Sequence, residues 1–428
     1  MTPLAPMPFP DTSFALTLVL LLIAPMAIAG LALVNVGLGR SRSAAQSLLG
    51  TLVVISTAVI AFVLVGWAMA SGSGRDIAFH LAGKSWDLVG AGRLLGMGVA
   101  DASAREQLVL LFEVLSVALA AMIPWGSGAD RLRLRAGAAI AAVFGVVVFP
   151  LAAHWTWSGW LAQLGTNFSI GNGFVDVGGA GAIHLLGGSA ALAVIWIAGP
   201  RKGKFPREGL STAMPGHNVV YVLFGSLLAL VGWLAWNMAG ALLWLNAVPL
   251  KLVVVAINTV LAATAALVAT FLVTRFRFGK PDASLCASGW LAGLVTSSAC
   301  SAVVSPIAAL FVGLVAGIFT PLLVELFELV LSIDDPSGAV SIHGAAGLWG
   351  LIAAGVFSSQ SGQFVAQLIG VSMLLGLMLP LIYGIFWLMD RVIAFRVDAD
   401  GERLGMDLHE LGGNAYPEFV VHRDESYR

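Results

Sequence analysis

Long apolar runs are the feature of this chain that most limits its fold. Eleven stretches of about 20 residues carry few charges or none, and a helix of that length can cross a lipid bilayer. Inside lipid the backbone must satisfy its own hydrogen bonds, which an α-helix does within one segment. We therefore expect an all-α polytopic membrane protein with eleven transmembrane helices, at residues 14–38, 44–71, 106–126, 136–155, 177–199, 217–241, 249–274, 284–304, 306–331, 339–358 and 363–392.

The composition excludes an ordinary soluble domain. Of the 428 residues, 59% are hydrophobic and 11% are charged, whereas charged residues make up about 25% of a soluble domain. The net charge of −1 gives no indication of a nucleic acid or other charged partner. Cys286 and Cys300 lie in apolar stretches, without the spacing of a disulfide framework or a metal site. Because the sequence contains no recognisable nucleophile, metal cluster or phosphate loop, we expect neither an enzyme nor a resident cofactor.

Two features complicate the placement of the helices. The third span contains Glu106 and Glu113, and the eighth and ninth spans meet near Pro306. The N-terminal stretch MTPLAPMPFPDTS lacks both the basic residues and the cleavage pattern of a signal peptide. We therefore expect a short extracytoplasmic segment, residues 1–13, followed by a first helix that is retained.

The distribution of basic residues predicts the orientation. An odd number of spans places the two termini on opposite sides of the membrane. With the N-terminus outside, 17 of the 22 Lys and Arg residues fall in the inner loops and the tail, and five fall outside. Cytoplasmic loops carry such an excess of positive charge. We expect an inner or plasma membrane protein with its N-terminus outside and its C-terminus in the cytoplasm.

One short pattern occurs twice: Asp, seven residues, His, three residues, Gly. The copies are Asp176, His184 and Gly188 in the fifth span, and Asp335, His343 and Gly347 at the tenth. Because five is odd, a second copy of a five-helix unit would lie upside down relative to the first, as in many transporters. The predicted segments are a first inverted repeat at 14–199, a cytoplasmic loop at 200–216, a second inverted repeat at 217–358, helix eleven at 363–392 and a cytoplasmic tail at 393–428.

A pair of histidines in apolar helices suggests a function. Desolvation disfavours the charged ring, and a neutral imidazole has one donor and one acceptor. Two facing rings, His184 and His343, could therefore share a hydrogen bond near the middle of the membrane and still offer groups to a guest. The simpler interpretation is that each ring ties helices together, although ionisable residues inside a membrane are usually functional.

Aspartates and tryptophans could build a site outward of the histidines. Asp335 is explained by helix capping, and Asp176 either caps the fifth helix or makes the outer mouth attractive to cations. Trp155, Trp157 and Trp160 lie in the outer loop, where Trp is commonly an interfacial anchor, but a Trp face also binds small cations. A cation site with neutral imidazoles deeper in would suit an amine that is recognised as an ion and then loses a proton.

These residues resemble the ammonium transporter (Amt/Mep/Rh) family along nearly the whole chain. The similar segments are LRLRAGAAIAAVF after GAD, AHWTWSGWL, HNVVYVLFGSLLALVGWLAWNMAGAL, CASGWLAGLV, DDPSGAVSIHG and the tail LGMDLHELGGNAYPEF. The resemblance implies a homotrimer whose subunits each contain a narrow apolar pore, which binds ammonium outside and passes ammonia. It implies that His184 and His343 form the twin-His pair of the pore. Trp157 would be the aromatic wall of the outer cation site, and Asp176 the buried carboxylate that supports it.

The sequence departs from the family pattern at the mouth of the pore. The family stacks two Phe as a gate, and the corresponding positions here are Ser116 and Trp236. The outer-site Ser of the family falls at Gly240, and Glu113 replaces an uncharged polar residue. We expect a rebuilt gate and outer site, with one Trp in place of two Phe. The tail reads Leu-Gly-Gly at 411–413 where the family has His-Gly-Glu, which puts control by a PII-type regulator in question.

Two other functions remain open from the sequence. The altered mouth is compatible with an ammonium sensor, or with a channel for methylammonium or another small neutral gas, and either would give weak ammonium flux. A haem-binding electron carrier would use paired histidines as axial ligands and would be coloured. The region between the histidines is very rich in small residues, and there is no second His pair at matching depth, which argues against haem.

Overall fold

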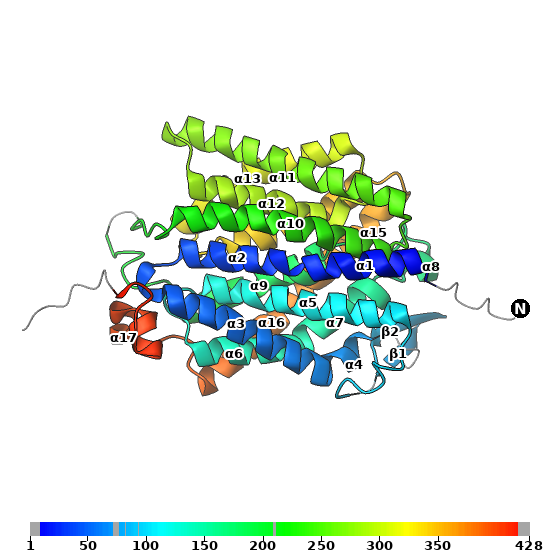
Figure 1. Cartoon of the computed structure of the whole chain (residues 1–428), viewed down its shortest axis with the longest axis horizontal. Helices are drawn as coiled ribbons and strands as arrows, with labels where there is room; N and C mark the ends of the chain where they lie inside the picture. The colour runs from blue at the N-terminus through cyan, green and yellow to red at the C-terminus, as the bar shows by residue number, and fades with distance from the viewer. Residues whose placement is uncertain (1–8, 72–76, 82, 93, 209–210, 418–428) are drawn as a thin grey trace, which may run out of the picture.

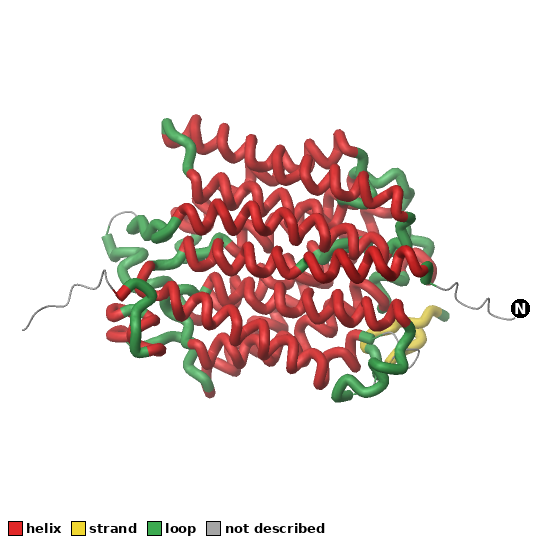
Figure 2. The backbone as a smooth tube through the Cα atoms, in the orientation of Figure 1, coloured by secondary structure: helices red, strands yellow, loops and turns green. Residues whose placement is uncertain are grey.

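The computed structural model describes residues 9–71, 77–81, 83–92, 94–208 and 211–417 as a bundle of long helices that run alongside one another (Figure 1). Most of it is helix, with loops at both ends of the bundle and strands at one end alone (Figure 2). Within the described residues, ten helices are long and apolar enough to cross a membrane, and Val340–Val356 is a shorter apolar helix. Each of the eleven predicted spans lies on one of these helices, so the predicted all-α polytopic class is confirmed.

The first half of the chain forms five of the long apolar helices. Short π-helical turns divide several of them, and Pro25 begins a new segment in the first, because a proline ring is tolerated in the first helical turn. The elements are α1 (Asp11–Ile23) and α2 (Pro25–Leu38), α3 (Ala44–Ala61), η2 (Phe62–Gly66) and α4 (Trp67–Ala70), α5 (Ala104–Ser127), α6 (Leu134–Val143), η3 (Phe144–Val148), α7 (Phe149–Ala153) and η4 (His154–Ser158), and η5 (Ala180–Leu185) and α9 (Leu186–Ala198).

The second half of the chain forms the remaining apolar helices and a short tail. Its elements are α10 (Val219–Trp244), α11 (Pro249–Phe278), α12 (Ala283–Cys300), α13 (Pro306–Glu325) and η6 (Leu326–Val330), η7 (Val340–Ala345) and α14 (Ala346–Val356), α15 (Gln363–Met373), η8 (Leu374–Met378) and α16 (Leu379–Val392), and the tail elements α17 (Ala399–Leu404) and η9 (Asp407–Leu411). Residues 1–8 of the predicted N-terminal segment and residues 418–428 of the predicted tail lie outside the described residues.

Local capping signals explain the two boundaries that are hard to place from the sequence. Glu106 belongs to a capping box at the start of α5, where it exchanges hydrogen bonds with Ser103. Pro306 is the first residue of α13, and the Ser305 side chain caps that helix by accepting from the Ala308 amide. The eighth predicted span ends earlier than expected, because α12 stops at Cys300 and a turn separates it from α13.

The two ends of the bundle differ. A hairpin of β1 (Ile77–Leu81) and β2 (Lys84–Val89), the short helix α8 (Leu164–Phe168) and the start of α1 lie at one end, which we call the hairpin end; α17 lies at the opposite end (Figure 1). The expectation of an all-helical chain missed the hairpin. Its strands are antiparallel, and Gly83 near the turn has a positive φ of 72°. Alternating apolar residues beside a glycine were the signal for it in the sequence.

Small residues let the helices pack closely, and large apolar side chains cover the outside. A Cβ on Gly313 or Gly317 of α13 would overlap the backbone of Ala262 or Ala266 in α11. Such small-residue contacts are typical of membrane helices. On the surface many large apolar side chains are exposed, including Phe276. A surface of this kind is suited to lipid rather than water.

Candidate functional site

His184 and His343 meet inside the bundle. The Nδ1 atoms of the two rings lie 3.2 Å apart, and the ring planes are 16° from parallel, with centroids 5.1 Å apart. Both side chains are buried, with 1% and 6% of their surface exposed. The predicted approach of the two histidines is therefore what the structure shows, although they are 159 residues apart in the chain.

Matching local structures position the two histidines. Each lies in a π-helical turn, η5 or η7, five residues after a glycine with positive φ: Gly179 at 84° and Gly338 at 66°. Left-handed backbone of this kind favours glycine, because other residues meet a steric penalty. The amide of the residue before each histidine donates to the carbonyl of that glycine, at 2.9 Å in η5 and 2.8 Å in η7. The repeated pattern thus encodes a repeated backbone geometry.

The aspartate of each pattern caps its own turn. The Asp176 Oδ2 atom accepts from the amides of Gly181 and Ala182 at 3.0 and 2.9 Å, and the Asp335 Oδ2 atom accepts from the Val340 amide at 2.8 Å. Capping is thus a real role of both aspartates, as the simpler interpretation of the sequence held. Asp176 is also buried, and its Oδ1 atom has no hydrogen-bond partner among the described residues.

The last residue of each pattern lets the two segments touch. A Cβ on Gly188 would overlap the backbone of Gly344, and a Cβ on Gly347 would press on the Ala180 carbonyl and the Leu185 amide. Gly344 and Leu185 are each the residue after a histidine, so the two contacts are equivalent. The glycines are needed because any side chain would push the two histidine-bearing segments apart.

Trp233 of α10 extends the histidine pair to three near-parallel rings. Its ring stacks on His184, with centroids 5.2 Å apart and planes 12° from parallel. Its Nε1 atom donates to the Ser298 hydroxyl of α12 at 2.9 Å, which fixes the indole in place. Sequence reasoning did not assign Trp233 to the site, although it lies in the GWLAWN segment that resembles the family.

The chemistry available to the pair follows from the inventory of an imidazole. Because both Nδ1 atoms share one hydrogen bond, one ring donates and the other accepts. The Nε2 atoms of the two rings then present one acceptor and one donor, and neither bonds to another described residue. A neutral pair can therefore take up a proton or a hydrogen-bonding guest at one nitrogen while the shared bond holds the rings.

A group of four aromatic residues, which we call the aromatic cluster, lies toward the hairpin end. It comprises Phe112, Trp157, Trp236 and Trp244. Trp157 and Trp244 are stacked face to face, with centroids 5.1 Å apart and planes 5° from parallel. The Phe112 ring meets Trp157, Trp236 and Trp244 edge-on at 5.3, 5.8 and 5.7 Å. Sequence reasoning found Trp157 and Trp236 but missed Trp244 and Phe112.

Ser116 and Gly240, two residues predicted to lie at the mouth, are held in close local contacts. Ser116 is fully buried, and its hydroxyl donates within α5 to the Phe112 carbonyl at 2.7 Å. The ring that faces Trp236 is Phe112, one helical turn earlier, and the role of Ser116 at the gate stays a prediction. Gly240 lies against the backbone of Val177, whose carbonyl oxygen a Cβ would overlap. Gly240 is therefore a close packing contact with Val177, and its membership of the cation site stays a prediction.

Trp157 and the segment around it are hydrogen-bonded to neighbouring parts of the hairpin end. Its Nε1 atom donates to the Asp176 carbonyl at 2.8 Å, which joins the two residues predicted to form the cation site. In the same turn, η4, the His154 Nε2 atom lies 2.9 Å from the Asp87 Oδ1 atom of β2. Gln163 donates to the other oxygen of Asp87 at 3.3 Å, so β2 and the segment around Trp157 are joined as one unit.

A buried charge cluster joins three loops at the other end of the bundle. Arg201 bonds to Asp334 at 2.8 Å and to Asp130 at 3.1 Å, while Arg131 donates to the Asp334 carbonyl at 2.8 Å. Burial alone would raise the pKa of Asp334, but the hydrogen bonds from Arg201 and the charge of Arg131 outweigh it and lower that pKa. The same pairing raises the pKa of Arg201 despite its burial.

The tail docks on the starts of two helices. The Asp407 Oδ1 atom accepts from the Gln46 amide at the start of α3 at 2.7 Å. Glu410 accepts from the Leu134 amide at the start of α6 at 2.9 Å. Acidic side chains stabilise helix N-termini through the free amides and the helix dipole. The described part of the tail is therefore a packed element of the fold.

The histidine pair does not fit a bis-imidazole haem site. Two nitrogens that bind one metal from opposite sides must be roughly 4 Å apart, because metal–imidazole bonds are about 2.0–2.1 Å long. Here the nearest ring nitrogens are 3.2 Å apart and share a hydrogen bond, with the rings stacked. Among the described residues, no group of three or more His, Cys, Asp or Glu could hold a metal ion.

Known proteins similar to this chain share its length and its fold. The chain matches the Ammonium Transporter Family over residues 14–416. It is 32% identical to ammonium transporter Amt2 of Archaeoglobus fulgidus over 424 residues, covering 93% of this chain and 86% of the relative. Amt2 of Haloferax mediterranei is also 32% identical, over 413 residues, covering 91% of this chain and 87% of the relative.

Two solved structures have the same fold as this chain. A structure described as Sensor Amt Protein has a TM-score of 0.84 at 24% identity, and the match covers 93% of this chain and 98% of the other. Mep2 of Candida albicans has a TM-score of 0.77 at 23% identity, covering 96% and 91%. These likenesses support the arrangement of helices that brings the two histidines together.

Proposed function

The chain belongs to the ammonium transporter family, and we propose that it moves ammonium across a membrane by passing ammonia along His184 and His343. The resemblance that the motifs indicated is confirmed by the match over residues 14–416. One observation carries the proposal: two buried imidazoles, from two copies of one pattern, share a hydrogen bond 3.2 Å long. Such a pair can exchange a proton and contact a small neutral amine.

The first step is recognition of the cation at the aromatic cluster. Ring faces attract small cations within about 6 Å of the ring centroid, and Trp is the strongest of the aromatic side chains. Trp244 covers one face of Trp157, so a cation on that face requires Trp244 to move aside. Asp176 supports the site in two ways: its carbonyl accepts from Trp157, and its buried carboxylate adds negative charge.

The second step is passage of the neutral molecule. Phe112 and Trp236 meet edge-on at 5.8 Å and form the gate, in place of the two stacked Phe of the family. Apolar rings at this point disfavour water and hydrated ions, because desolvating an ion is costly. We propose that the ammonium ion transfers its proton to the acceptor ring nitrogen of the histidine pair and continues as ammonia, which hydrogen-bonds the same rings.

The architecture that we propose is a pair of inverted five-helix repeats, at 14–199 and 217–358, followed by helix eleven. The repeated glycine, capping and histidine geometry of η5 and η7 supports this symmetry. The charge distribution supports an extracytoplasmic hairpin end and a cytoplasmic tail. From the family we propose a homotrimer in an inner or plasma membrane, with one passage in each subunit. Light scattering of the purified protein tests the number of subunits directly.

The tail, residues 393–428, is proposed as the regulatory segment. Asp407 and Glu410 cap α3 and α6, so release of the tail would uncap two helices at once. A PII-type regulator is the partner that the family suggests. Because the Leu411–Gly413 region differs from the family pattern, binding of such a regulator to this chain has to be tested. Removal of residues 403–428 should leave the trimer intact and change the transport rate. An unchanged rate would remove the tail from regulation.

Uptake by reconstituted protein tests the function. Proteoliposomes should take up methylammonium saturably, with competition by ammonium and without competition by potassium. Correctly assembled trimers that show weak flux but an ammonium-dependent change in Trp fluorescence would favour a sensor instead. The observation that favours a sensor as the second function is the stacking of Trp157 on Trp244, because ligand binding would have to move these rings.

A further inference from the structure

Glu113 of α5 is an acidic side chain inside the bundle that has no partner. It is 3% exposed, its Oε2 atom is enclosed without a hydrogen bond, and it bonds to no other residue in the described ranges. A buried charge is normally paired or bound to a cation, because leaving it alone in a low dielectric is costly. A side chain of this kind at a membrane depth is a candidate for function.

The place of Glu113 in the chain puts it beside the aromatic cluster. Glu113 follows Phe112, whose ring contacts Trp157, Trp236 and Trp244. The helix that carries both residues starts at Ala104, so Glu113 lies in its third turn from the hairpin end. Glu113 is therefore close to the level at which a cation would meet the aromatic rings.

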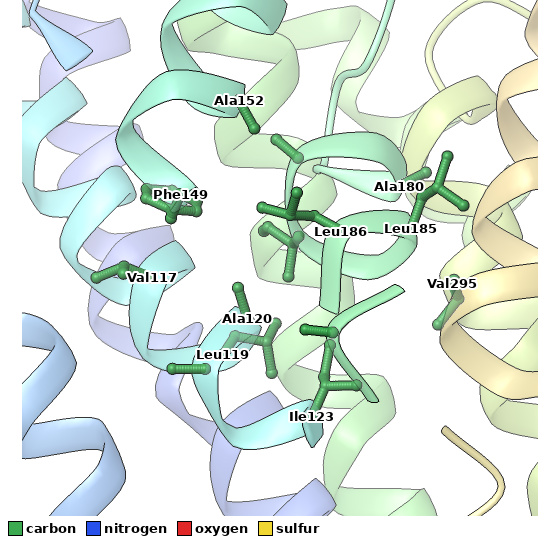
Figure 3. Packing of buried hydrophobic residues seen from close by; sticks show 14 of the residues in the cluster. Val117, Leu119, Ala120, Ile123, Phe149, Ala152, Ala180, Leu185, Leu186 and Val295 are labelled. Carbon is green, nitrogen blue, oxygen red and sulfur yellow. The ribbon is translucent and has the colours of Figure 1, made fainter. Parts of the chain in front are cut away.

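The packing of α5 shows which way Glu113 faces. A Cβ on Gly187 of α9 would meet the Ile123 side chain and the Ala120 carbonyl, so this face of α5 packs against α9. Figure 3 shows Ala120 and Ile123 beside the segment that carries Leu185 and Leu186. Glu113 lies seven residues before Ala120, hence on the same face and about 10 Å closer to the hairpin end.

A shift of seven residues toward the hairpin end along α9 and η5 leads from Gly187 to Ala180. The third and fifth spans run in the same direction, because the chain crosses the membrane twice between the start of one and the start of the other. Glu113 thus lies at the level of Ala180, the first residue of η5, which precedes His184 in the same turn. This is the section of the passage that a cation must enter before it loses its proton.

We infer that Glu113 is a cation-binding carboxylate of the outer site and sets the preference for the ammonium ion over the neutral amine. The inference rests on the proposed function and identifies the charged ligand of the same site. A carboxylate oxygen accepts N–H groups of ammonium or methylammonium, while the aromatic faces contact the rest of the ion. Gly240 offers no hydroxyl, and the Ser116 hydroxyl is turned to the Phe112 carbonyl. Glu113 adds to the site a carboxylate with an unpartnered oxygen, which accepts the N–H groups of the cation.

A substitution that removes the charge of Glu113 but keeps the shape of its side chain tests the inference. The variant is Glu113→Gln, and the matched control is Glu106→Gln, an exposed position on the same helix where Gln can also complete a capping box. The transport KM for methylammonium should rise about tenfold or more in E113Q, since a hydrogen bond to a charged group has that effect on affinity. The maximal rate should change less, and E106Q should match the natural protein.

A binding measurement separates this inference from the proposed function. Thermal unfolding of the detergent-solubilised protein is followed with methylammonium chloride and with sodium chloride at equal ionic strength. We expect methylammonium to stabilise the natural protein, and E113Q to need about tenfold more methylammonium chloride for the same stabilisation. This result supports the inference even where flux is absent. Equal methylammonium dependence and equal KM in E113Q and the natural protein would overturn it, whatever the transport rate.

A shorter carboxylate keeps the inference testable if E113Q does not assemble. Glu113→Asp retains the charge and withdraws it by one methylene from the site. A KM raised severalfold, with the maximal rate kept, supports a direct contact with the cation. An unchanged KM in Glu113→Asp counts against it, because a residue that only fills space would affect thermal stability and not affinity.

Discussion

Trp233 stacks on His184, and His184 stacks on His343, with successive ring centroids 5.2 and 5.1 Å apart. The indole is fixed by its bond to Ser298, so the first histidine is held between a rigid ring and its partner. A Trp face also stabilises a neighbouring cation. Trp233 therefore orients His184, and its ring face lies where it would stabilise a positive charge on that imidazole.

Replacement of Trp233 tests this role. We expect Trp233→Leu to lower the initial rate of methylammonium uptake roughly 2- to 10-fold, the effect of losing one aromatic pair. Trp233→Phe, which keeps a ring but not the bond to Ser298, should lose less. The matched control is Trp196→Leu, an exposed Trp of α9. Equal rates in Trp233→Leu and Trp196→Leu would show that the stack does not matter for transport.

Gly188 sets the distance between the two histidine-bearing segments. Gly188→Ala places a methyl group against the backbone of Gly344, and overpacking of this kind costs about 1–3 kcal/mol. We expect a lower melting temperature and loss of uptake. Gly376→Ala is the control, because a Cβ there meets open space and the position is helical too. A Gly188→Ala protein as active and as stable as Gly376→Ala would contradict the close approach.

Gly240 distinguishes a packing contact from a vacant binding position. The family pattern would suggest that Gly240→Ser restores an outer-site hydroxyl and raises the affinity for ammonium. The structure predicts the opposite, because the new Cβ would overlap the Val177 carbonyl oxygen next to Asp176. We expect lower thermal stability and no gain in affinity by uptake kinetics. A stable Gly240→Ser protein with a lower KM would show that α10 can move away from Val177.

The charge cluster at the tail end predicts a pH dependence of stability. The pKa of Asp334 is lowered in the folded protein, so its stabilising effect is present above the unfolded value of about 3.9 and is lost as the pH falls through the folded value. Asp334→Asn should destabilise the protein by about 3–5 kcal/mol at neutral pH, since it removes one partner of a buried pair.

Melting temperatures of the two proteins check this pH dependence. The difference between the natural protein and Asp334→Asn should be large at pH 7 and should shrink as the pH falls below about 4. A difference that stays constant down to the lowest pH at which the protein remains folded would mean that the Asp334 charge is not what stabilises the cluster.

The parts of the site that could be predicted are those that the sequence repeats. His184 and His343 stand out because an Asp, a His and a Gly recur at the same spacing, and the structure shows why: each residue has the same local task in η5 and η7. Apolar length predicted the spans equally well, because a helix is the one regular structure that satisfies the backbone inside lipid within a single segment.

The parts of the site that could not be predicted depend on contacts between side chains and backbone of different helices. Ser116 occupies the aligned gate position, but Phe112 lies one turn away on the same face of α5 and fills the space with its ring. Trp244 sits among apolar residues near the end of α10, where nothing in the sequence shows that it stacks on Trp157. From the sequence, Gly240 is a position where a hydroxyl of the family is absent; the structure shows in addition that the Val177 backbone packs against it.

The histidine pair is the centre of the proposed mechanism, and ammonium-induced current tests it most directly. Proteoliposomes adsorbed on a solid-supported membrane receive pulses of ammonium, methylammonium or potassium, with the natural protein, His184→Ala and His343→Ala at equal reconstituted amounts. We expect a saturable, ammonium-selective response from the natural protein, and loss of that response or of its selectivity in both variants, which still form the same oligomer. Natural amplitude and selectivity in both variants would contradict a role for the paired imidazoles in transport.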